Sequence, residues 1–270
     1  MDTLAPQQTD LLLTERRGAV SILTLNRPAA RNSLSLAMIA ALHAAIESEG
    51  SAPGVLAIVL RGAPPAFCAG HDLKEMQGRR KDSDRGRAFF DETMRSCAAL
   101  MQAIVACPKP VIAAVNGIAT AAGCQLVASC DLAVAGEGAQ FATPGVNIGL
   151  FCSTPMVALS RNVSRKNAME MLLLGDMVPA GKAQELGLVN RVVPDGLVLE
   201  AALEIADKIA AKSPLTLAIG KKAFYRQLEM PLAEAYDYTA KVMVENMLAR
   251  DAEEGIGAFL DKRKPEWTGS

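Results

Sequence analysis

A strand-like run followed by a loop and a helix occurs twice in the first half of the chain. The apolar segment 55–60 precedes the loop 62–69 and a helix that begins at Asp72, and segment 111–116 precedes a helix over 121–129. Apolar, β-branched runs bounded by Gly and Pro are typical of buried strands. The two units form a weak internal repeat, which predicts an α/β core.

The same patterns predict the other elements of the first half. Strands are expected at 11–15, 20–25 and 131–135, and helices at 35–48, which Gly50 is expected to close, and at 87–107. We expect residues 1–9 to form a loose tail. The charged run 78–87 is expected to be a mobile, solvated loop.

After residue 164 the sequence predicts helices only. They are expected at 164–175, 180–186, 197–211, 214–228 and 231–248. Pro214 and Pro231 each suit a first helical turn. The chain is therefore divided into an α/β core over 10–195 and a helical region over 196–270 that serves packing and oligomerisation.

Composition excludes several classes of function. The 270 residues include 28 basic and 29 acidic side chains, a net charge of −1, which gives no reason to expect nucleic acid or an anionic membrane as a partner. Six cysteines form no CxxC pair and only two histidines are present, so no metal site is expected. No signal peptide or membrane span is recognisable, and a cytoplasmic location is expected.

Two loops combine small residues with the start of a helix: 69–72 (AGHD) and 120–124 (TAAGC). The first N–H groups of a helix have no intrahelical partner and favour negative charge. Two such loops facing each other would hold an oxygen that gains charge during a reaction, as an oxyanion hole does. A Gly-rich turn between strand and helix is also ordinary architecture, so spacing alone leaves both interpretations open.

Four stretches resemble the crotonase, or enoyl-CoA hydratase/isomerase, superfamily. They are 26–28 (NRP), 66–76 (AFCAGHDLKEM), 109–117 (KPVIAAVNG) with 123–126 (GCQL), and 258–264 (AFLDKRK). Within the superfamily, the chain is similar to the enoyl-CoA hydratase domain-containing proteins that carry GHDL and ATAAGCQL. The resemblance implies a superhelix of repeated strand-strand-helix turns, a C-terminal helical region that forms trimers or hexamers, and an acyl-CoA thioester as ligand without any further cofactor.

The resemblance also assigns roles to residues. It implies that the thioester carbonyl accepts hydrogen bonds from the backbone N–H groups of His71 and Ala122, where the family usually has Gly at the second position. The CoA side would be lined by Ala69, Leu73 and Lys74, with Arg31 nearby, and the nucleotide of a neighbouring subunit would be reached by Phe259 and Lys262. The two lysines are alternatively ordinary solvated side chains.

Hydratases of this superfamily use two glutamates to hold a water molecule and move its protons, and this chain lacks both. The matching positions are Gln125 and Gly145, neither of which is a proton donor and acceptor of the carboxylate type. Hydration is therefore doubtful, although the resemblance alone suggests a lyase. Decarboxylation or hydrolysis of an acyl-CoA, or binding without catalysis, remain alternatives. Cys152 is a candidate nucleophile, or part of a packed loop in which Ser153 or Thr154 caps the next helix.

Overall fold

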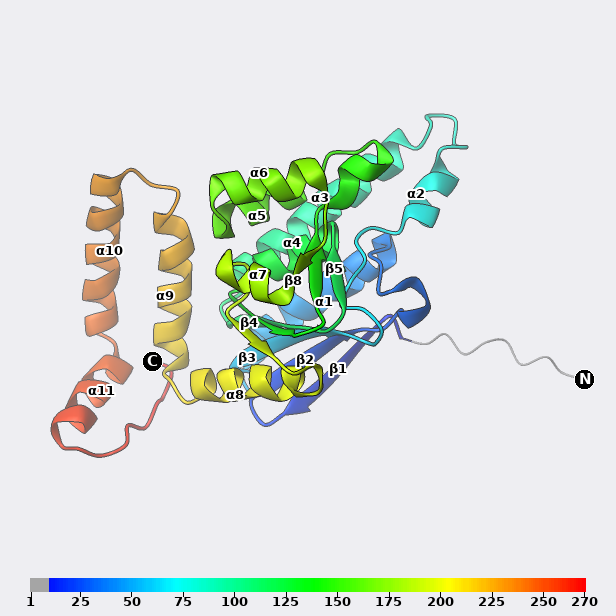
Figure 1. Ribbon diagram of the computed structural model, residues 1–270. Coiled ribbons are helices and arrows are strands. Elements are labelled where there is room, and N and C mark those ends of the chain that lie inside the picture. The colour runs from blue at the N-terminus through cyan, green and yellow to red at the C-terminus, as the bar shows by residue number, and fades with distance from the viewer. Residues whose placement is uncertain (1–9) are drawn as a thin grey trace, which may run out of the picture.

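The computed structural model describes residues 10–270 (Figure 1); the tail predicted for residues 1–9 lies outside them. A six-stranded sheet in the order β1-β2-β3-β4-β6-β9 forms its centre. β1 and β2 are antiparallel, and every later pairing is parallel. The strands are β1 (Leu12–Arg17), β2 (Val20–Leu25), β3 (Ala57–Gly62), β4 (Val111–Val115), β6 (Leu132–Gly136) and β9 (Arg191–Val193). The predicted α/β core is confirmed.

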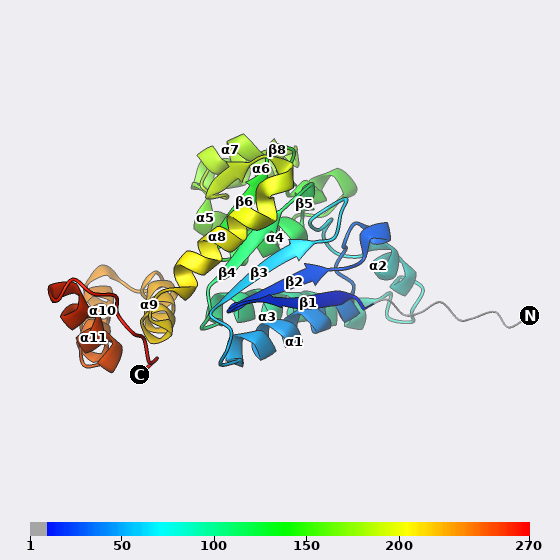
Figure 2. The ribbon, with the colours of Figure 1, turned by 90° about the horizontal axis from the view of Figure 1, so that it is seen from below.

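Both faces of the central strands β2, β3, β4 and β6 are largely buried, so alternate residues of these strands enter different cores. Ala57 and Val59 of β3 pack toward helix α8 (Val198–Ala210), whereas Ile58 and Leu60 face the larger core. Figure 2 shows α8 across one face of the sheet, with α1 and α3 against the other. A strand that is buried on both faces has a continuous apolar sequence, which explains why these strands could be predicted.

A second, three-stranded sheet carries one wall of the candidate site. It consists of β5 (Ile118–Thr120), β7 (Gln140–Ala142) and β8 (Val178–Pro179). β5 and β7 are parallel, and β7 and β8 are antiparallel. None of these strands exceeds three residues, which is too short for a period of two to be visible in the sequence.

The core also contains seven helices and three 3-10 turns before α8. They are η1 (Pro28–Ala30), α1 (Leu36–Ser51), α2 (Leu73–Arg79), α3 (Arg87–Ala106), α4 (Ala122–Ser129), η2 (Pro144–Ile148), α5 (Pro155–Asn162), α6 (Arg165–Leu174) and α7 (Ala180–Glu185); a third turn, η3 (Asp195–Leu197), leads into α8. Asp72 caps α2 as predicted, by accepting from the N–H groups of Lys74 and Glu75. Gly50 does not end α1, which continues to Ser51. A Cβ atom at Gly50 would lie 3.0 Å from Cys107 Sγ.

The last three helices stand to one side of the sheet (Figure 1). They are α9 (Pro214–Gln227), α10 (Leu232–Met247) and α11 (Arg250–Leu260). The sequence predicted the first two and missed α11. Lys221 of α9 donates to Asp131 Oδ2 at 2.6 Å, and Tyr225 donates to Asp131 Oδ1 at 2.9 Å. The division at residue 196 stays a prediction, although α8, which it assigns to the helical region, packs on the sheet.

Three general features bear on function. All six cysteines are buried free thiols. Within residues 10–270, no helix combines the length and apolarity needed to cross a membrane. The same part of the chain contains no group of three or more His, Cys, Asp or Glu side chains that could hold a metal ion.

Candidate active site

The first loop, residues 63–72, runs from β3 to α2 and is tied to the start of α1. Leu34 N–H donates to Gly70 O at 2.8 Å, and Asp72 N–H donates to Leu34 O at 3.0 Å. These two bonds lie on either side of His71 in the sequence. The backbone around His71 is therefore fixed from both directions, as in a short strand pairing.

Side chains of the NRP segment clamp the same loop. Arg27 Nη2 lies 2.9 Å from Asp72 Oδ2. The Asn32 side chain accepts from Arg27 N–H at 2.9 Å and donates to Ala63 O and Ala66 O, both at 2.7 Å. Asn32 is fully buried with φ +55°, a conformation that Asn tolerates better than most residues. The polar residues after β2 therefore position the loop that contains His71.

The second loop joins β5 to α4 and packs directly on the first. Thr120 N–H donates to Cys68 O at 2.9 Å, and Ala121 N–H donates to Ala142 O at 2.9 Å. A Cβ atom at Gly123 would collide with Cys68 O, so only Gly permits this approach. Ala121 has φ +50° and ψ −117°, a region that strains any residue with a side chain.

Two backbone N–H groups where these loops meet have no hydrogen-bond partner among residues 10–270. One belongs to His71, and the other to Ala122, the first residue of α4, which has no intrahelical acceptor. A Cβ atom at Gly70 would lie 3.4 Å from Ala122 N and 2.9 Å from Ala121 Cβ. The structure therefore brings together the two loops predicted from the sequence and leaves both predicted donors free.

The His71 side chain is partly buried beside this contact, and its Nε2 atom is fully buried. Its Nε2 atom has no partner among the described residues. Burial disfavours the charged imidazolium and lowers the pKa of His71 to about 4. The imidazole is neutral at pH 7 and is a weak base there.

Gln125 and Gly145, which the resemblance matches to the two hydratase glutamates, provide no carboxylate. Gln125 is 4 % exposed, and its Oε1 has no partner within residues 10–270. A Cβ atom at Gly145 would lie 2.9 Å from both Cys152 Sγ and Leu150 O. The thiol and a backbone carbonyl therefore occupy the space that a side chain at position 145 would need.

The loop after η2 does not activate its cysteine. Burial raises the pKa of the Cys152 thiol, although the Gly145 N–H partly opposes the shift. A protonated thiol is a weak nucleophile. The predicted capping is wrong: the Ser153 hydroxyl donates to Phe151 O at 3.3 Å, and Thr154 precedes α5 without a side-chain cap bond.

The sequence profile of one protein family, enoyl-CoA hydratase/isomerase, matches residues 15–270. The chain belongs to the enoyl-CoA hydratase/isomerase family. This confirms the crotonase-type fold. An enoyl-CoA hydratase crystal structure from Mycobacterium smegmatis superimposes with a TM-score of 0.90 at 50 % identity, covering 96 % of this chain and 99 % of that one. The human enoyl-CoA hydratase domain-containing protein 3 gives 0.90 at 44 % identity, covering 96 % and 100 %.

A curated relative bears on the cellular location. Rat enoyl-CoA hydratase domain-containing protein 3, mitochondrial, is 45 % identical over 258 residues, which cover 96 % of this chain and 84 % of the rat protein. Frog and human relatives carry the same mitochondrial name. The cytoplasmic location expected from the sequence is therefore wrong; it rested on the unpaired cysteines and on an N-terminus without a recognisable signal.

The residues expected on the CoA side of this family site fall into two groups. Ala69 N–H donates to Arg31 O at 3.0 Å, so these two residues lie side by side. Leu73 and Lys74 follow in the first turn of α2 and are exposed. Phe259 belongs to the second group. It lies in α11, far from α2 in Figure 1.

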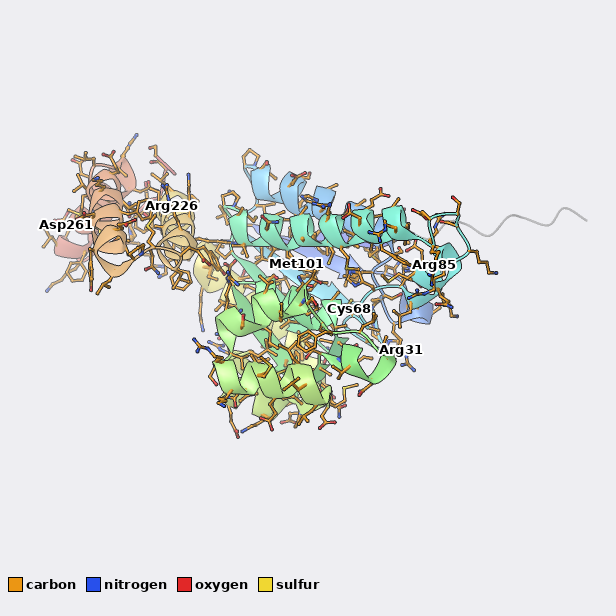
Figure 3. The ribbon with its side chains drawn as sticks, turned by 90° about the horizontal axis from the view of Figure 1, so that it is seen from above. Arg31, Cys68, Arg85, Met101, Arg226 and Asp261 are labelled. Carbon is orange, nitrogen blue, oxygen red and sulfur yellow. The ribbon has the colours of Figure 1, made fainter. Side chains whose placement is uncertain are left out.

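Lys262 belongs with Phe259 in the second group. Asp261, its neighbour, lies at the opposite end of the molecule from Arg31 (Figure 3). Within one chain, the structure does not bring Phe259 or Lys262 to the loops. Their contact with the nucleotide of a neighbouring subunit stays a prediction.

Three residues of the site escaped the sequence analysis. Asn32 and Arg27 position the first loop through long-range contacts, and Ala121 holds the strained turn. The NRP motif signalled that its segment matters but not what it touches. Nothing in the sequence marks Ala121 as having positive φ, since that conformation usually belongs to Gly.

Proposed function

We propose that this chain binds acyl-CoA thioesters, with the thioester carbonyl oxygen accepting hydrogen bonds from His71 N–H and Ala122 N–H. The observation that supports this is the pair of free N–H groups on two loops in contact. Preorganised backbone donors stabilise an oxygen as it gains charge and need no reorganisation during the reaction. Family membership supplies the ligand class.

The residues favour a reaction that needs enolate stabilisation but no activated water. In decarboxylation of a malonyl-type thioester, the bond between the α-carbon and the carboxylate breaks and CO₂ leaves. The electron pair moves to the carbonyl oxygen held by the two N–H groups, and the α-carbon then takes a proton from solvent. Hydration of an enoyl thioester would require general acid–base groups, and Gln125 and Gly145 offer none.

A second candidate is an acyl-CoA binder without catalysis. The observation in its favour is the neutral character of the site: the pKa of His71 is lowered to about 4 and that of Cys152 is raised. Neither side chain is a good proton-transfer group or nucleophile near pH 7. Hydrolysis of the thioester is disfavoured for the same reason.

The proposed carbonyl site can be tested from the ligand side. Butyryl-CoA contains the thioester carbonyl, and the thioether butyl-CoA lacks it. Two hydrogen bonds of about 1 kcal/mol each predict roughly tenfold or greater loss of affinity for the thioether. Equal affinities in isothermal titration calorimetry would refute the carbonyl site. Turnover of methylmalonyl-CoA against crotonyl-CoA then separates decarboxylase, hydratase and binder.

Ala122→Pro tests the same donor from the protein side. Ala122 occupies the first helical position, where Pro removes an N–H that has no intrahelical role. The preceding Ala121 has a conformation that Pro disfavours, so circular dichroism must first establish that α4 persists. A folded variant is expected to lose about half of its preference, in free energy, for butyryl-CoA over butyl-CoA, because His71 N–H still donates.

We further propose that the C-terminal helices assemble the protein into a trimer or a pair of trimers. Five large apolar side chains of α10 and α11 and the residues that follow them are each more than 70 % exposed: Leu232, Tyr236, Leu248, Phe259 and Leu260. Apolar area of this kind usually marks an interface. Light scattering that gave a stable monomer at micromolar concentration would exclude this assembly.

A further inference from the structure

The segment from Lys74 to Arg87 concentrates positive charge beside the first loop. It covers most of α2, the turn after it and the first residue of α3. Six basic and three acidic residues give it a formal charge of +3, in a chain whose total charge is −1. This surface therefore differs in sign from the rest of the molecule. Its basic side chains are all exposed: Lys74, Arg79, Arg80, Lys81, Arg85 and Arg87.

Two of the three acidic side chains are occupied by backbone groups. Glu75 Oε2 accepts from Leu36 N–H at 3.1 Å, at the start of α1. Asp84 accepts from the N–H groups of Gly86 and Ala88 at 2.9 and 2.8 Å. These carboxylates fix the ends of the segment to its neighbours. They do not form ion pairs with its basic side chains.

Two of the basic side chains lie on aromatic rings. The guanidinium carbon of Arg79 is 4.9 Å from the centre of the Phe89 ring, and that of Arg80 is 5.5 Å from the centre of the Phe90 ring. The third acid, Asp82, is 3.8 Å from Arg79 Nη1. A guanidinium on a ring face is held in place and keeps its charge and its N–H donors. The basic surface is therefore preorganised.

Three further basic side chains have no acidic partner. Within residues 10–270, no carboxylate lies within 4.0 Å of Lys74, Lys81 or Arg85. Arg85 lies at the same end of the molecule as Arg31 (Figure 3), whose carbonyl oxygen accepts from Ala69 N–H in the first loop. Uncompensated positive charge is thus presented to solvent next to the loop that contributes a proposed thioester donor.

The form of this surface favours a protein as its partner. The charges are spread over two helix ends and the turn between them, and Leu73 beside them is 52 % exposed. Protein interfaces combine apolar contacts with charges of complementary sign that steer the encounter. The turn follows α2, whose seven residues span about 10 Å, whereas His71 precedes it. A partner docked on the turn reaches the thioester site only if its acyl group is attached to a flexible arm.

We propose that the surface formed by residues 74–87 docks an acidic carrier protein that presents its acyl thioester on a phosphopantetheine arm. The inference rests on the proposed thioester binding, because the acyl group enters the same carbonyl site. CoA and a carrier protein hold the acyl group through the same pantetheine thioester. They differ in what lies beyond it, which is a nucleotide in CoA and a folded acidic surface in the carrier protein.

The test places one acyl group on three carriers. Butyryl-pantetheine has no charged carrier, butyryl-CoA adds the nucleotide, and a butyryl-loaded acyl carrier protein adds an acidic protein surface. Isothermal titration calorimetry gives the three affinities at low and high salt. At low salt, we expect the loaded carrier protein to bind roughly tenfold more tightly than butyryl-pantetheine. High salt is expected to abolish most of this difference, because it screens exposed charges.

A double charge reversal assigns the docking to this surface. Lys81→Glu with Arg85→Glu changes two cations that neither a carboxylate nor a ring holds, so the fold is expected to persist. We expect this variant to bind the loaded carrier protein roughly tenfold more weakly and butyryl-pantetheine unchanged. Lys212→Glu with Lys222→Glu makes the same change of charge at exposed positions before and within α9, away from α2 (Figure 1). It is expected to alter neither affinity.

Two results would overturn the inference. One is a loaded carrier protein that binds no more tightly than butyryl-pantetheine. The other is an equal loss of affinity for butyryl-CoA and the loaded carrier protein on charge reversal, since the surface would then recognise the phosphates of the nucleotide. If none of the three thioesters binds, the proposed thioester site itself is refuted and the inference falls with it.

Discussion

Cys152 Sγ lies 2.9 Å from the point where a Cβ atom at Gly145 would stand. Leu150 O lies at the same distance from that point. Real Cβ atoms do not approach sulfur or carbonyl oxygen so closely, so the loop after η2 is built around a glycine. The packing at position 145 therefore leaves no room for a glutamate side chain there.

We expect Gly145→Ala to lower the free energy of unfolding by about 1–3 kcal/mol, the usual cost of overpacking. Cys152→Gly in the same chain is expected to recover part of that loss, because it removes one of the two close contacts. A double-mutant cycle in urea measures the coupling between the sites. Gly181→Ala is the matched control, since no atom lies within 4 Å of the added methyl. If the changes in unfolding free energy caused by the substitutions at positions 145 and 152 are additive, the proposed contact between the two positions is contradicted.

The same contact predicts that glutamates alone do not restore hydration. In a variant with Gln125→Glu and Gly145→Glu, the second carboxylate is displaced by Leu150 O and Cys152 Sγ. Its hydration of crotonyl-CoA is expected to stay at the level of the parent protein, far below roughly one turnover per second. A spectrophotometric assay of crotonyl-CoA consumption compares the double variant with the parent. Hydration by the unaltered protein at an enzymatic rate would contradict the whole assignment of this site.

The sequence predicted the parts of the site that lie within contiguous motifs. The loops at His71 and Ala122 each follow a buried strand and precede a helix, so local pattern and resemblance both located them. The Arg27–Asp72 pair and the bonds of Asn32 join segments tens of residues apart. No local sequence pattern indicates such contacts, so they could not be predicted before the fold was known.

Other misses have a similar physical origin. Gly50 looked like a helix end, because Gly commonly ends helices. Its real constraint is the approach of Cys107 Sγ from α3, which leaves no room for a larger residue. The solvated loop predicted for 78–87 is confirmed over 80–85, which form exposed turns, but its bounds differ. In the structure α2 extends to Arg79, whose guanidinium lies 4.9 Å from the centre of the Phe89 ring.

The strained backbone of Ala121 predicts a stabilising substitution. Its φ of +50° and ψ of −117° suit Gly, and residues in such regions store about 1–3 kcal/mol of strain. Part of the gain is offset because Gly makes the unfolded chain more flexible. Ala121→Gly is therefore expected to raise the free energy of unfolding by about 1 kcal/mol.

Ala128→Gly provides the control for this substitution. Ala128 lies inside α4, where Gly costs about 1 kcal/mol relative to Ala. The two variants are expected to shift the urea midpoint in opposite directions. A loss of stability in Ala121→Gly equal to that in Ala128→Gly would show that position 121 is not strained.

The partly buried imidazole of His71 predicts a loss of stability in mild acid. Its folded-state pKa of about 4 lies below the ordinary value of 6.5 because burial disfavours the charged form. Between these values the unfolded chain binds a proton that the folded chain does not, so stability falls as pH decreases. At pH 5 the contribution is about 2 kcal/mol. His71→Gln is expected to flatten the pH dependence between 7 and 5, whereas His43→Gln, at a half-exposed position, keeps it. If the unfolding free energies of the parent and of His71→Gln change with pH in the same way, His71 is not the cause of the acid destabilisation.

A buried ion pair between Lys221 and Asp131 holds the C-terminal helices to the core. Its Nζ lies 2.6 Å from Asp131 Oδ2 and 3.1 Å from the carbonyl oxygens of Ile104 and Lys109. The Lys221 and Asp131 side chains are only 8 % and 16 % exposed. Removing one partner of a buried pair costs about 3–5 kcal/mol, because the other charge is left uncompensated.

Lys221→Met is therefore expected to lower the free energy of unfolding by about 3 kcal/mol and to loosen α9 from the segments that contain Lys109 and Asp131. Adding Asp131→Asn removes the stranded charge but keeps an acceptor for Val111 N–H, which now donates to Asp131 at 2.7 Å. The double variant is thus expected to be more stable than Lys221→Met alone. Lys222→Met, at the exposed neighbouring position, is expected to be near neutral in the same urea titration. If the Lys221 and Lys222 variants unfold alike, Asp131 does not anchor α9, and the helices that carry the proposed subunit interface are held to the core by apolar packing alone.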